Sequence, residues 1–124
     1  LNNRIGLKLK ARGSYGQARG FFRQALKLNP SNGRPYLSIA TMYAKSANNC
    51  GQSNFDKRAV YWLAAAEARK AARVDPTQKK NAAKSVANYN AKAPQKSEIF
   101  SSGRAGQTIK IGCWIGASVT VPSI

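Results

Sequence analysis

Two stretches of the chain, Ala25-Leu26-Lys27-Leu28-Asn29-Pro30 and Ala71-Ala72-Arg73-Val74-Asp75-Pro76, end in the same way and decide the fold. Each closes a helical pattern with an Asn-Pro or Asp-Pro pair, and the residue before a proline avoids helical backbone angles. Each stretch therefore predicts the end of a helix. The two prolines lie 46 positions apart, so one helical signal occurs twice in a short chain.

Small and aromatic residues recur in a fixed order around these stretches, at the spacing of a tetratricopeptide repeat of about 34 residues. The first period holds the expected residue types at Gly6, Ala18, Phe22 and Pro30. The second period holds them at Tyr36, Ile39, Ala40, Tyr43, Ala64, Ala68 and Pro76. The second half of this period begins about 12 residues later than the spacing predicts, which indicates an insertion at about residues 46–57.

The chain therefore resembles the tetratricopeptide repeat family over residues 1–92. The resemblance implies a mainly α fold, a stack of antiparallel helix pairs, since a single amphipathic helix cannot bury its apolar stripe alone. A generic bundle of helical hairpins with coincidental spacing is the alternative interpretation.

The resemblance also implies a concave groove, lined by the first helix of each pair, that holds a protein partner. The corresponding groove residues are Asn3, Leu7, Lys10, Arg34, Leu37, Thr41 and Lys45. Some family members grip the terminal carboxylates of a peptide through a fixed set of Lys, Asn and Arg positions, of which the Asn positions are the key ones. Leu7 and Thr41 occupy those places here, so this carboxylate clamp is not expected.

The period of the sequence changes from helical to twofold beyond Pro94. A third helix over about residues 78–91 stops before this proline, and residues 93–106 are expected to be a linker. Two alternating runs joined through Gly116-Ala117 predict a β-hairpin over residues 107–124.

The first strand of this hairpin should place Ile109, Ile111 and Cys113 on one face. A lone hairpin is only marginally stable in water. We therefore expect it to pack on the helices or to be exchanged with another copy of the chain.

Two cysteines, Cys50 in the insertion and Cys113 in the hairpin, lie in the two segments that lack a core of their own. They are either two unrelated buried thiols or one disulfide, which would stabilise the fold by roughly 4 kcal/mol. A disulfide predicts an oxidising compartment and hence an exported protein, extracellular or periplasmic. The segments around both cysteines also resemble exported bacterial tetratricopeptide proteins.

The composition is strongly basic, with 21 Lys and Arg against four Asp and Glu and a net charge of +17. Such a field favours polyanionic or acidic partners, although a solvated basic face is the simpler reading. No nucleic-acid-binding motif accompanies the charge. The basic residues that can form stripes are Arg12, Arg19, Arg23, Lys27, Arg69, Lys70, Arg73, Lys79, Lys80 and Lys84.

The sequence contains no pattern of residues that indicates a catalytic site. The chain has no His, and its four acids are scattered, so neither an acid–base pair nor a metal site is expected. The glycine-rich stretches lack the Lys-Ser/Thr pair of a phosphate loop. We expect no cofactor, no metal and no enzymatic activity. No apolar run approaches the length of a membrane span.

Two function classes remain. The first is a scaffold for protein–protein interaction or self-assembly, including as a subunit of an extracellular filament. The first helix starts abruptly without a polar cap, which predicts that upstream sequence or another subunit covers it. The alternative class is a basic module that binds anionic polymers, such as nucleic acid or acidic polysaccharide.

Overall fold

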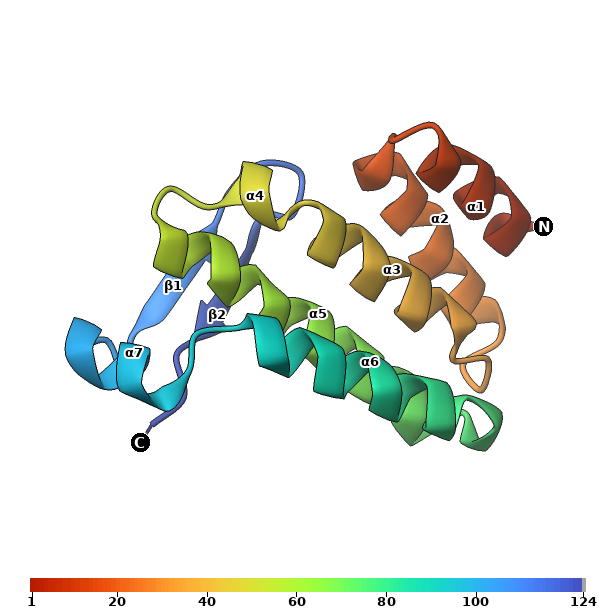
Figure 1. Ribbon diagram of the computed structural model, residues 1–124. Helices are drawn as coiled ribbons and strands as arrows, with labels where there is room; N and C mark the ends of the chain where they lie inside the picture. Colours follow the sequence, from red (N-terminus) through yellow and green to blue (C-terminus); the bar gives the residue numbers. More distant parts are fainter. Residues whose placement is uncertain (124) are drawn as a thin grey trace.

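Residues 1–123 are described by the structure, a computed structural model (Figure 1). Its helices are α1 (Asn2–Ala11), α2 (Tyr15–Leu28), α3 (Arg34–Lys45), α4 (Ala47–Cys50), α5 (Asn54–Val74), α6 (Lys79–Lys92) and α7 (Lys96–Ser102). A 3₁₀ turn, η1 (Pro76–Gln78), precedes α6, and the strands β1 (Thr108–Ile111) and β2 (Ala117–Thr120) follow α7. The described residues are mainly helical with a small C-terminal sheet, as the sequence predicts.

Helix α5 is the longest element, with 21 residues, and it organises the others. Helices α3 and α6 pack along it, and both strands contact it. Helices α1 and α2 pack against each other, and α2 joins this pair to α3. Figure 1 shows that α1 and α2, α3 and α5, and α5 and α6 run antiparallel.

Small side chains allow these helices to approach closely. Five alanines of α5 are fully buried: Ala59, Ala64, Ala65, Ala68 and Ala71. Gly6 plays the same role in α1, since a Cβ atom there would lie 2.7 Å from the Phe22 Cε1 atom. The small residues that recur in the sequence therefore mark helix–helix contacts.

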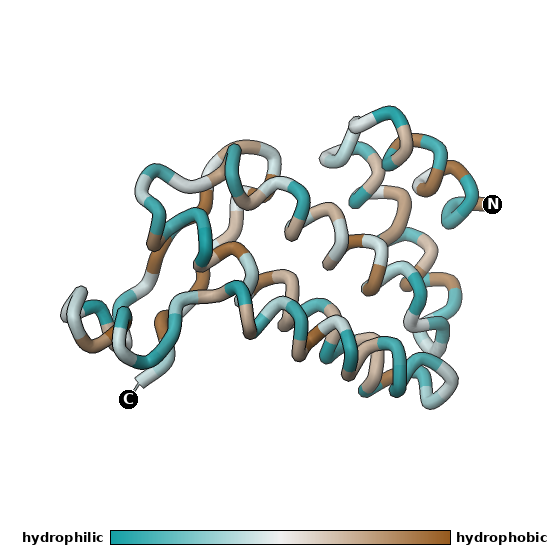
Figure 2. The backbone as a smooth tube through the Cα atoms, viewed as in Figure 1, coloured by the Kyte–Doolittle hydropathy of each residue, from teal (hydrophilic) through white to brown (hydrophobic). Residues whose placement is uncertain are grey.

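The hydrophobic core joins the helices to the hairpin. The largest fully buried apolar side chains include Phe22, Ile39, Met42, Val60, Ile111, Ile115 and Val121. Figure 2 shows hydrophobic segments of the hairpin beside hydrophobic segments of the helices. The hairpin is therefore packed on the helices of its own chain.

Asp75, in the second of the two stretches that decide the fold, connects the ends of three helices. Its Oδ2 atom accepts a hydrogen bond from the buried Gly33 N–H at 2.8 Å, which fixes the turn between α2 and α3. Its Oδ1 atom accepts bonds from the N–H and hydroxyl of Thr77 at 3.0 and 2.6 Å. These bonds, from Thr77 first and then Gly33, hold the pKa of Asp75 below its ordinary value.

The segments predicted as insertion and linker both contain helical structure. Residues 46–57 form α4 and the first turn of α5, whose N-terminus is capped by Ser53 Oγ accepting from the Asp56 N–H. Residues 93–106 contain α7, which begins with a reciprocal capping box between Gln95 and Glu98. The third helix runs over Lys79–Lys92, close to the predicted 78–91.

The hairpin is shorter than predicted. Strand β1 ends at Ile111 and pairs antiparallel with β2, so that Ile109 lies opposite Val119 and Ile111 opposite Ala117. The expectation that Cys113 shares the face of Ile109 and Ile111 is wrong, because Cys113 lies in the loop between the strands with a φ of 50°. The loop breaks the twofold alternation after Ile111.

Candidate functional site

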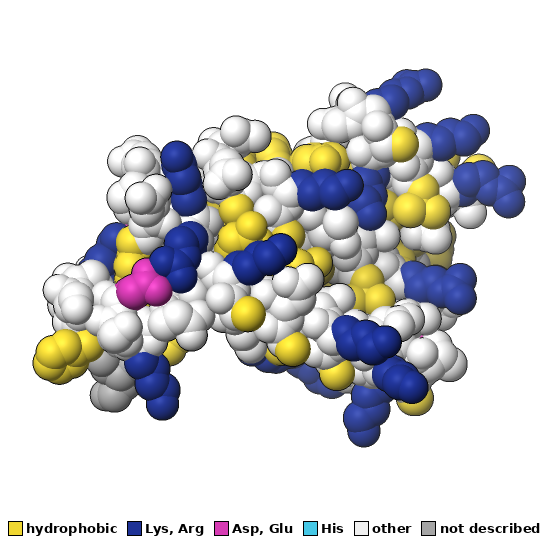
Figure 3. All heavy atoms as spheres, viewed as in Figure 1, with side chains coloured by type: hydrophobic (Ala, Val, Ile, Leu, Met, Phe, Trp, Pro, Cys, Tyr) yellow, Lys and Arg dark blue, Asp and Glu magenta, His cyan; other side chains and the backbone are white. Residues whose placement is uncertain are grey.

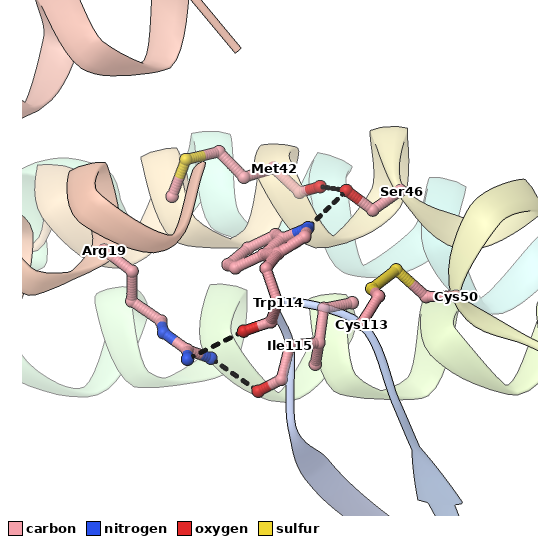
Figure 4. Close-up of a disulfide and its surroundings, with 7 residues drawn as sticks. All are labelled: Arg19, Met42, Ser46, Cys50, Cys113, Trp114 and Ile115. Carbon is pink, nitrogen blue, oxygen red and sulfur yellow. Dashed lines mark hydrogen bonds between the residues drawn. A yellow bond between two sulfur atoms is a disulfide. The ribbon is translucent and has the colours of Figure 1, made fainter. Parts of the chain in front are cut away.

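A disulfide joins the loop of the hairpin to the end of α4 (Figure 4). The Cα atoms of Cys50 and Cys113 are 5.5 Å apart, within the range that a disulfide requires. Of the two alternatives that the sequence leaves open, the structure has the pair at disulfide distance, and residues 1–123 contain no free cysteine.

The side chain of Trp114, next to the disulfide, inserts between helices. Its Nε1–H donates to Ser46 Oγ at 2.9 Å, and Ser46 Oγ–H donates to the Met42 carbonyl at 2.9 Å. The ring contacts Tyr15 edge-on at 5.6 Å between centroids and Tyr43 at 5.3 Å. A partly buried chain of hydrogen bonds and two aromatic contacts therefore hold the hairpin loop in place.

Arg19 of α2 closes this arrangement from the other side. Its guanidinium lies 5.1 Å from the Trp114 ring centroid and donates to the carbonyls of Trp114 and Ile115 at 3.0 and 2.8 Å. A third bond reaches the Tyr43 hydroxyl at 3.0 Å. We call Arg19, Ser46, Trp114 and the disulfide the hairpin latch; its role is to fix the C-terminal segment.

All four acidic side chains of the protein are engaged within it. Asp56 pairs with Arg104 at 2.8 Å, Glu98 pairs with Arg58, and Asp75 is held by Gly33 and Thr77. Glu67, only 5% exposed, accepts two bonds from Arg23 at 2.8 and 3.2 Å and contacts Lys70 at 3.4 Å. The folded chain therefore presents no unengaged Asp or Glu side chain over residues 1–123.

Two of the ten residues predicted for the basic surface do not belong to it. Arg19 serves the hairpin latch, and Arg23 is turned toward Glu67. Burial acts to lower the pKa of Arg23, but the hydrogen bonds and charge of Glu67 outweigh it and raise that pKa. Both lie next to the buried Ala18 and Phe22 of α2, which directs them toward neighbouring elements.

The remaining predicted basic residues are concentrated on one part of the molecule. Six of the eight lie on the C-terminal half of α5 and the N-terminal half of α6: Arg69, Lys70, Arg73, Lys79, Lys80 and Lys84. Arg12 and Lys27 are exposed on α1–α2. Figure 3 shows basic side chains spread over the visible face and acidic ones at a single place, near α7.

Residues predicted for the partner groove line two hollows between α1 and α3 that share Lys10. The first, of about 470 Å³, is lined by Leu7, Lys10 and Lys45 together with residues of the α1–α2 turn. The second, of about 330 Å³, is lined by Lys10, Arg34, Leu37, Thr41, Ser38 and Gln78. The structure thus brings six of the seven predicted groove residues together.

Asn3 is the exception, because it lines neither hollow. Its Oδ1 atom is buried and has no hydrogen-bond partner among residues 1–123. Sequence reasoning missed Ser38 and Gln78. Ser38 was detectable, since it follows Arg34 by four residues on the same face of α3. Gln78 belongs to η1, which the helical period does not reveal.

The electrostatics of the groove are set by cations, because no Asp or Glu lines either hollow. Burial, and then the charge of Lys45, hold the pKa of Lys10 below its ordinary value. Arg12, which also lines the first hollow, and Arg34, exposed at the start of α3, bring the cations to four. Leu7, 46% exposed, and the half-buried Leu37 supply apolar surface. The groove can therefore receive a ligand that carries both carboxylates and apolar groups.

The comparisons with known proteins assign no family. No protein-family model matches the chain, and no curated protein or solved structure matches it significantly. Within residues 1–123, no cluster of three or more His, Cys, Asp and Glu is placed to hold a metal. No helix in this part of the chain has the length and apolar character of a membrane span.

Proposed function

We propose that this chain is a non-enzymatic interaction module of the tetratricopeptide type, which holds an acidic segment of a protein partner in the groove between α1 and α3. The observation that carries the proposal is the meeting of Lys10 and Lys45 in a groove with no carboxylate. Two cations held close together disfavour each other until an anion lies between them. An acidic ligand removes that repulsion.

The burial of the repeat positions supports the family assignment. Gly6, Ala18 and Phe22 of the first period are buried, and so are most of the small and aromatic residues of the second, whereas Tyr36 is half-buried. The buried residues of the second period are Ile39, Ala40, Tyr43, Ala64 and Ala68. In this assignment α1 and α2 form the first pair, α3 and α5 form the second, and α6 begins a third.

Peptide binding tests the groove directly. The probe is a fluorescent peptide of alternating Glu and Tyr, followed by anisotropy against a matched peptide with Lys in place of Glu. Lys10→Gln and Lys45→Gln should each weaken binding of the acidic peptide about fivefold, since each removes one partly exposed charged hydrogen bond. Lys8→Gln is the control, because Lys8 is exposed on α1 and lines neither hollow. Equal losses in all three variants would refute the groove as the site.

Binding of anionic polymers is the second candidate function, favoured by the balance of paired and unpaired charges. Four of the 21 basic residues pair with acidic side chains, namely Arg23, Arg58, Lys70 and Arg104. The other 17 have no carboxylate partner among residues 1–123. Binding to heparin or duplex DNA should show no sequence preference and weaken steeply as salt rises. Lack of binding at low salt would eliminate this candidate.

Self-association, including as a subunit of an extracellular filament, is part of the proposal under one condition. Copies without an unengaged acidic side chain repel one another, and short-range apolar contact, raised salt or an anionic coat such as acidic glycan must overcome that repulsion. Light scattering should detect large particles at raised salt or when the polyanion is added, and none at low salt without it. The disulfide supports export to the periplasm or the cell exterior, because such bonds persist in oxidising compartments.

A further inference from the structure

A second groove, separate from the one between α1 and α3, runs between α5 and α6. It has a volume of about 390 Å³ and is lined by Ala72, Ala82, Ala83, Val86 and Ala87, with Arg69 and Lys79 at its rim. Ala83 and Ala87 are exposed, and Val86 is half-buried. Arg69 and Lys79 are exposed on opposite helices, and neither forms an ion pair over residues 1–123. Figure 3 shows apolar and basic side chains side by side over α6.

The shape of this groove suits a helix. The backbone N–H and C=O groups of α5 and α6 are used within those helices, so the groove offers no hydrogen bonds to an extended chain. A helical ligand satisfies its own backbone groups and needs only side-chain contact. The alanine floor lets a third helix axis approach closely, as alanines already do between α3 and α5. The lining residues of α6, from Lys79 to Ala87, extend about 12 Å, which matches two turns of a ligand helix.

The charge of the groove determines the chemistry of that helix. Basic side chains at both edges fit acidic residues that flank an apolar stripe. A second copy of this chain does not match, because α1, α2, α3 and α6 contain no Asp or Glu. The acids of α5 and α7 are Asp56, Glu67 and Glu98, which are all engaged internally. The occupant is therefore not one of these helices from a second copy.

We propose that the groove between α5 and α6 binds an acidic amphipathic helix of a partner protein, with its apolar stripe on Ala83, Val86 and Ala87 and its carboxylates on Arg69 and Lys79. This site is independent of the groove between α1 and α3. The two sites can be separated by variants.

The probe is a synthetic helical peptide of about 18 residues, or five turns, with Leu at helical spacing and Glu on both flanks. A second peptide has the same composition in an order that destroys the stripe. Binding is measured by fluorescence anisotropy at physiological salt. The striped peptide should bind the native protein, and the reordered peptide should bind about tenfold more weakly, because only the first can bury its leucines.

Variants then locate the bound peptide. Ala83→Gln and Ala87→Gln fill the groove without lowering helix propensity much, and each should weaken binding about tenfold. Arg69→Gln and Lys79→Gln should each weaken it about threefold. The controls are Ala91→Gln and Lys84→Gln, at exposed positions of α6 outside the lining, and Lys10→Gln in the other groove.

The controls define the results that overturn the proposal. If Lys84→Gln weakens binding as much as Lys79→Gln, only the overall charge attracts the peptide. Undiminished binding to Ala83→Gln and Ala87→Gln excludes the groove, and a loss with Lys10→Gln alone places the peptide between α1 and α3. Binding to vesicles containing anionic phospholipid but not to the striped peptide would assign this face to a membrane instead.

Discussion

Loss of the disulfide should lower the free energy of unfolding by about 4 kcal/mol and yet leave the hairpin loop docked in the native state. The bond joins residues separated by 63 positions, Cys50 and Cys113. In the chain-entropy model, removing a crosslink of that span frees the unfolded chain by about 4 kcal/mol at 25 °C. This amount is a large share of the free energy of unfolding of a typical domain, which is roughly 5–15 kcal/mol.

The rest of the hairpin latch explains why the loop should stay docked. Trp114 Nε1–H donates to Ser46, and Arg19 donates to the carbonyls of Trp114 and Ile115. Each of these hydrogen bonds contributes about 1 kcal/mol, and the contacts of the Trp114 ring add to them. The latch therefore has about 3 kcal/mol of hydrogen bonding that does not depend on the disulfide.

Tryptophan fluorescence measures both quantities in one titration. The chain has two tryptophans, and Trp62→Phe leaves Trp114 as the sole reporter. In that background, Cys50→Ala with Cys113→Ser is compared with the oxidised protein during denaturant unfolding. We expect a lower midpoint for the double variant and an unchanged emission maximum without denaturant.

Either of two results would refute this reasoning. Coincident midpoints would mean that the disulfide does not reduce the conformational entropy of the unfolded chain. A red-shifted emission of the double variant without denaturant would mean that the disulfide alone holds Trp114 in place. The first result would refute the value of about 4 kcal/mol for the disulfide. The second would refute the value of about 3 kcal/mol for the hydrogen bonds of the latch.

Two further predictions concern close packing and acid. Gly6→Ala should lower the free energy of unfolding by about 1 kcal/mol, since the clash with the Phe22 ring exceeds the gain in helix propensity. Gly20→Ala has open space around it and should raise the free energy of unfolding by about 0.5–1 kcal/mol. Equal effects of the two variants in chemical denaturation would disprove the packing argument. Thr77 and Gly33 hold the pKa of Asp75 below its ordinary value, and Arg58 and Gln95 do the same for the pKa of Glu98. The stabilisation from both groups is therefore present at neutral pH, and it is lost as the pH falls below the ordinary carboxyl range and through their lowered pKa values. Denaturation midpoints measured from about pH 7 to pH 3 should decline, and the double variant Asp75→Asn, Glu98→Gln should decline less; parallel curves would count against this assignment.

The features that the sequence predicts correctly depend on local periodicity. The buried positions Gly6 and Ala64 could be identified because small residues recur at helical spacing where helices approach closely. The disulfide could be anticipated because Cys50 and Cys113 lie in segments with little core of their own. These inferences need no knowledge of which distant residues meet.

The features that the sequence does not reveal depend on contacts between distant segments. Arg19 looks like part of an exposed basic stripe, but its acceptors are carbonyls 95 and 96 positions away. Arg23 finds Glu67 from 44 positions away. Helix α7 was missed because its seven residues carry little apolar periodicity, although the Gln95 and Glu98 capping box was readable.

The four acidic side chains stabilise the fold, and the unpaired basic side chains are left to bind partners. Asp56, Glu67 and Asp75 belong to α5 or its C-cap, and Glu98 pairs with Arg58 of α5, so every acid ties another segment to this central helix. The unpaired Lys and Arg side chains repel one another, and this repulsion destabilises the folded state. An anionic partner that binds only the folded chain reduces this repulsion and adds its binding free energy to stability. Any partner of either groove is therefore also expected to stabilise the fold.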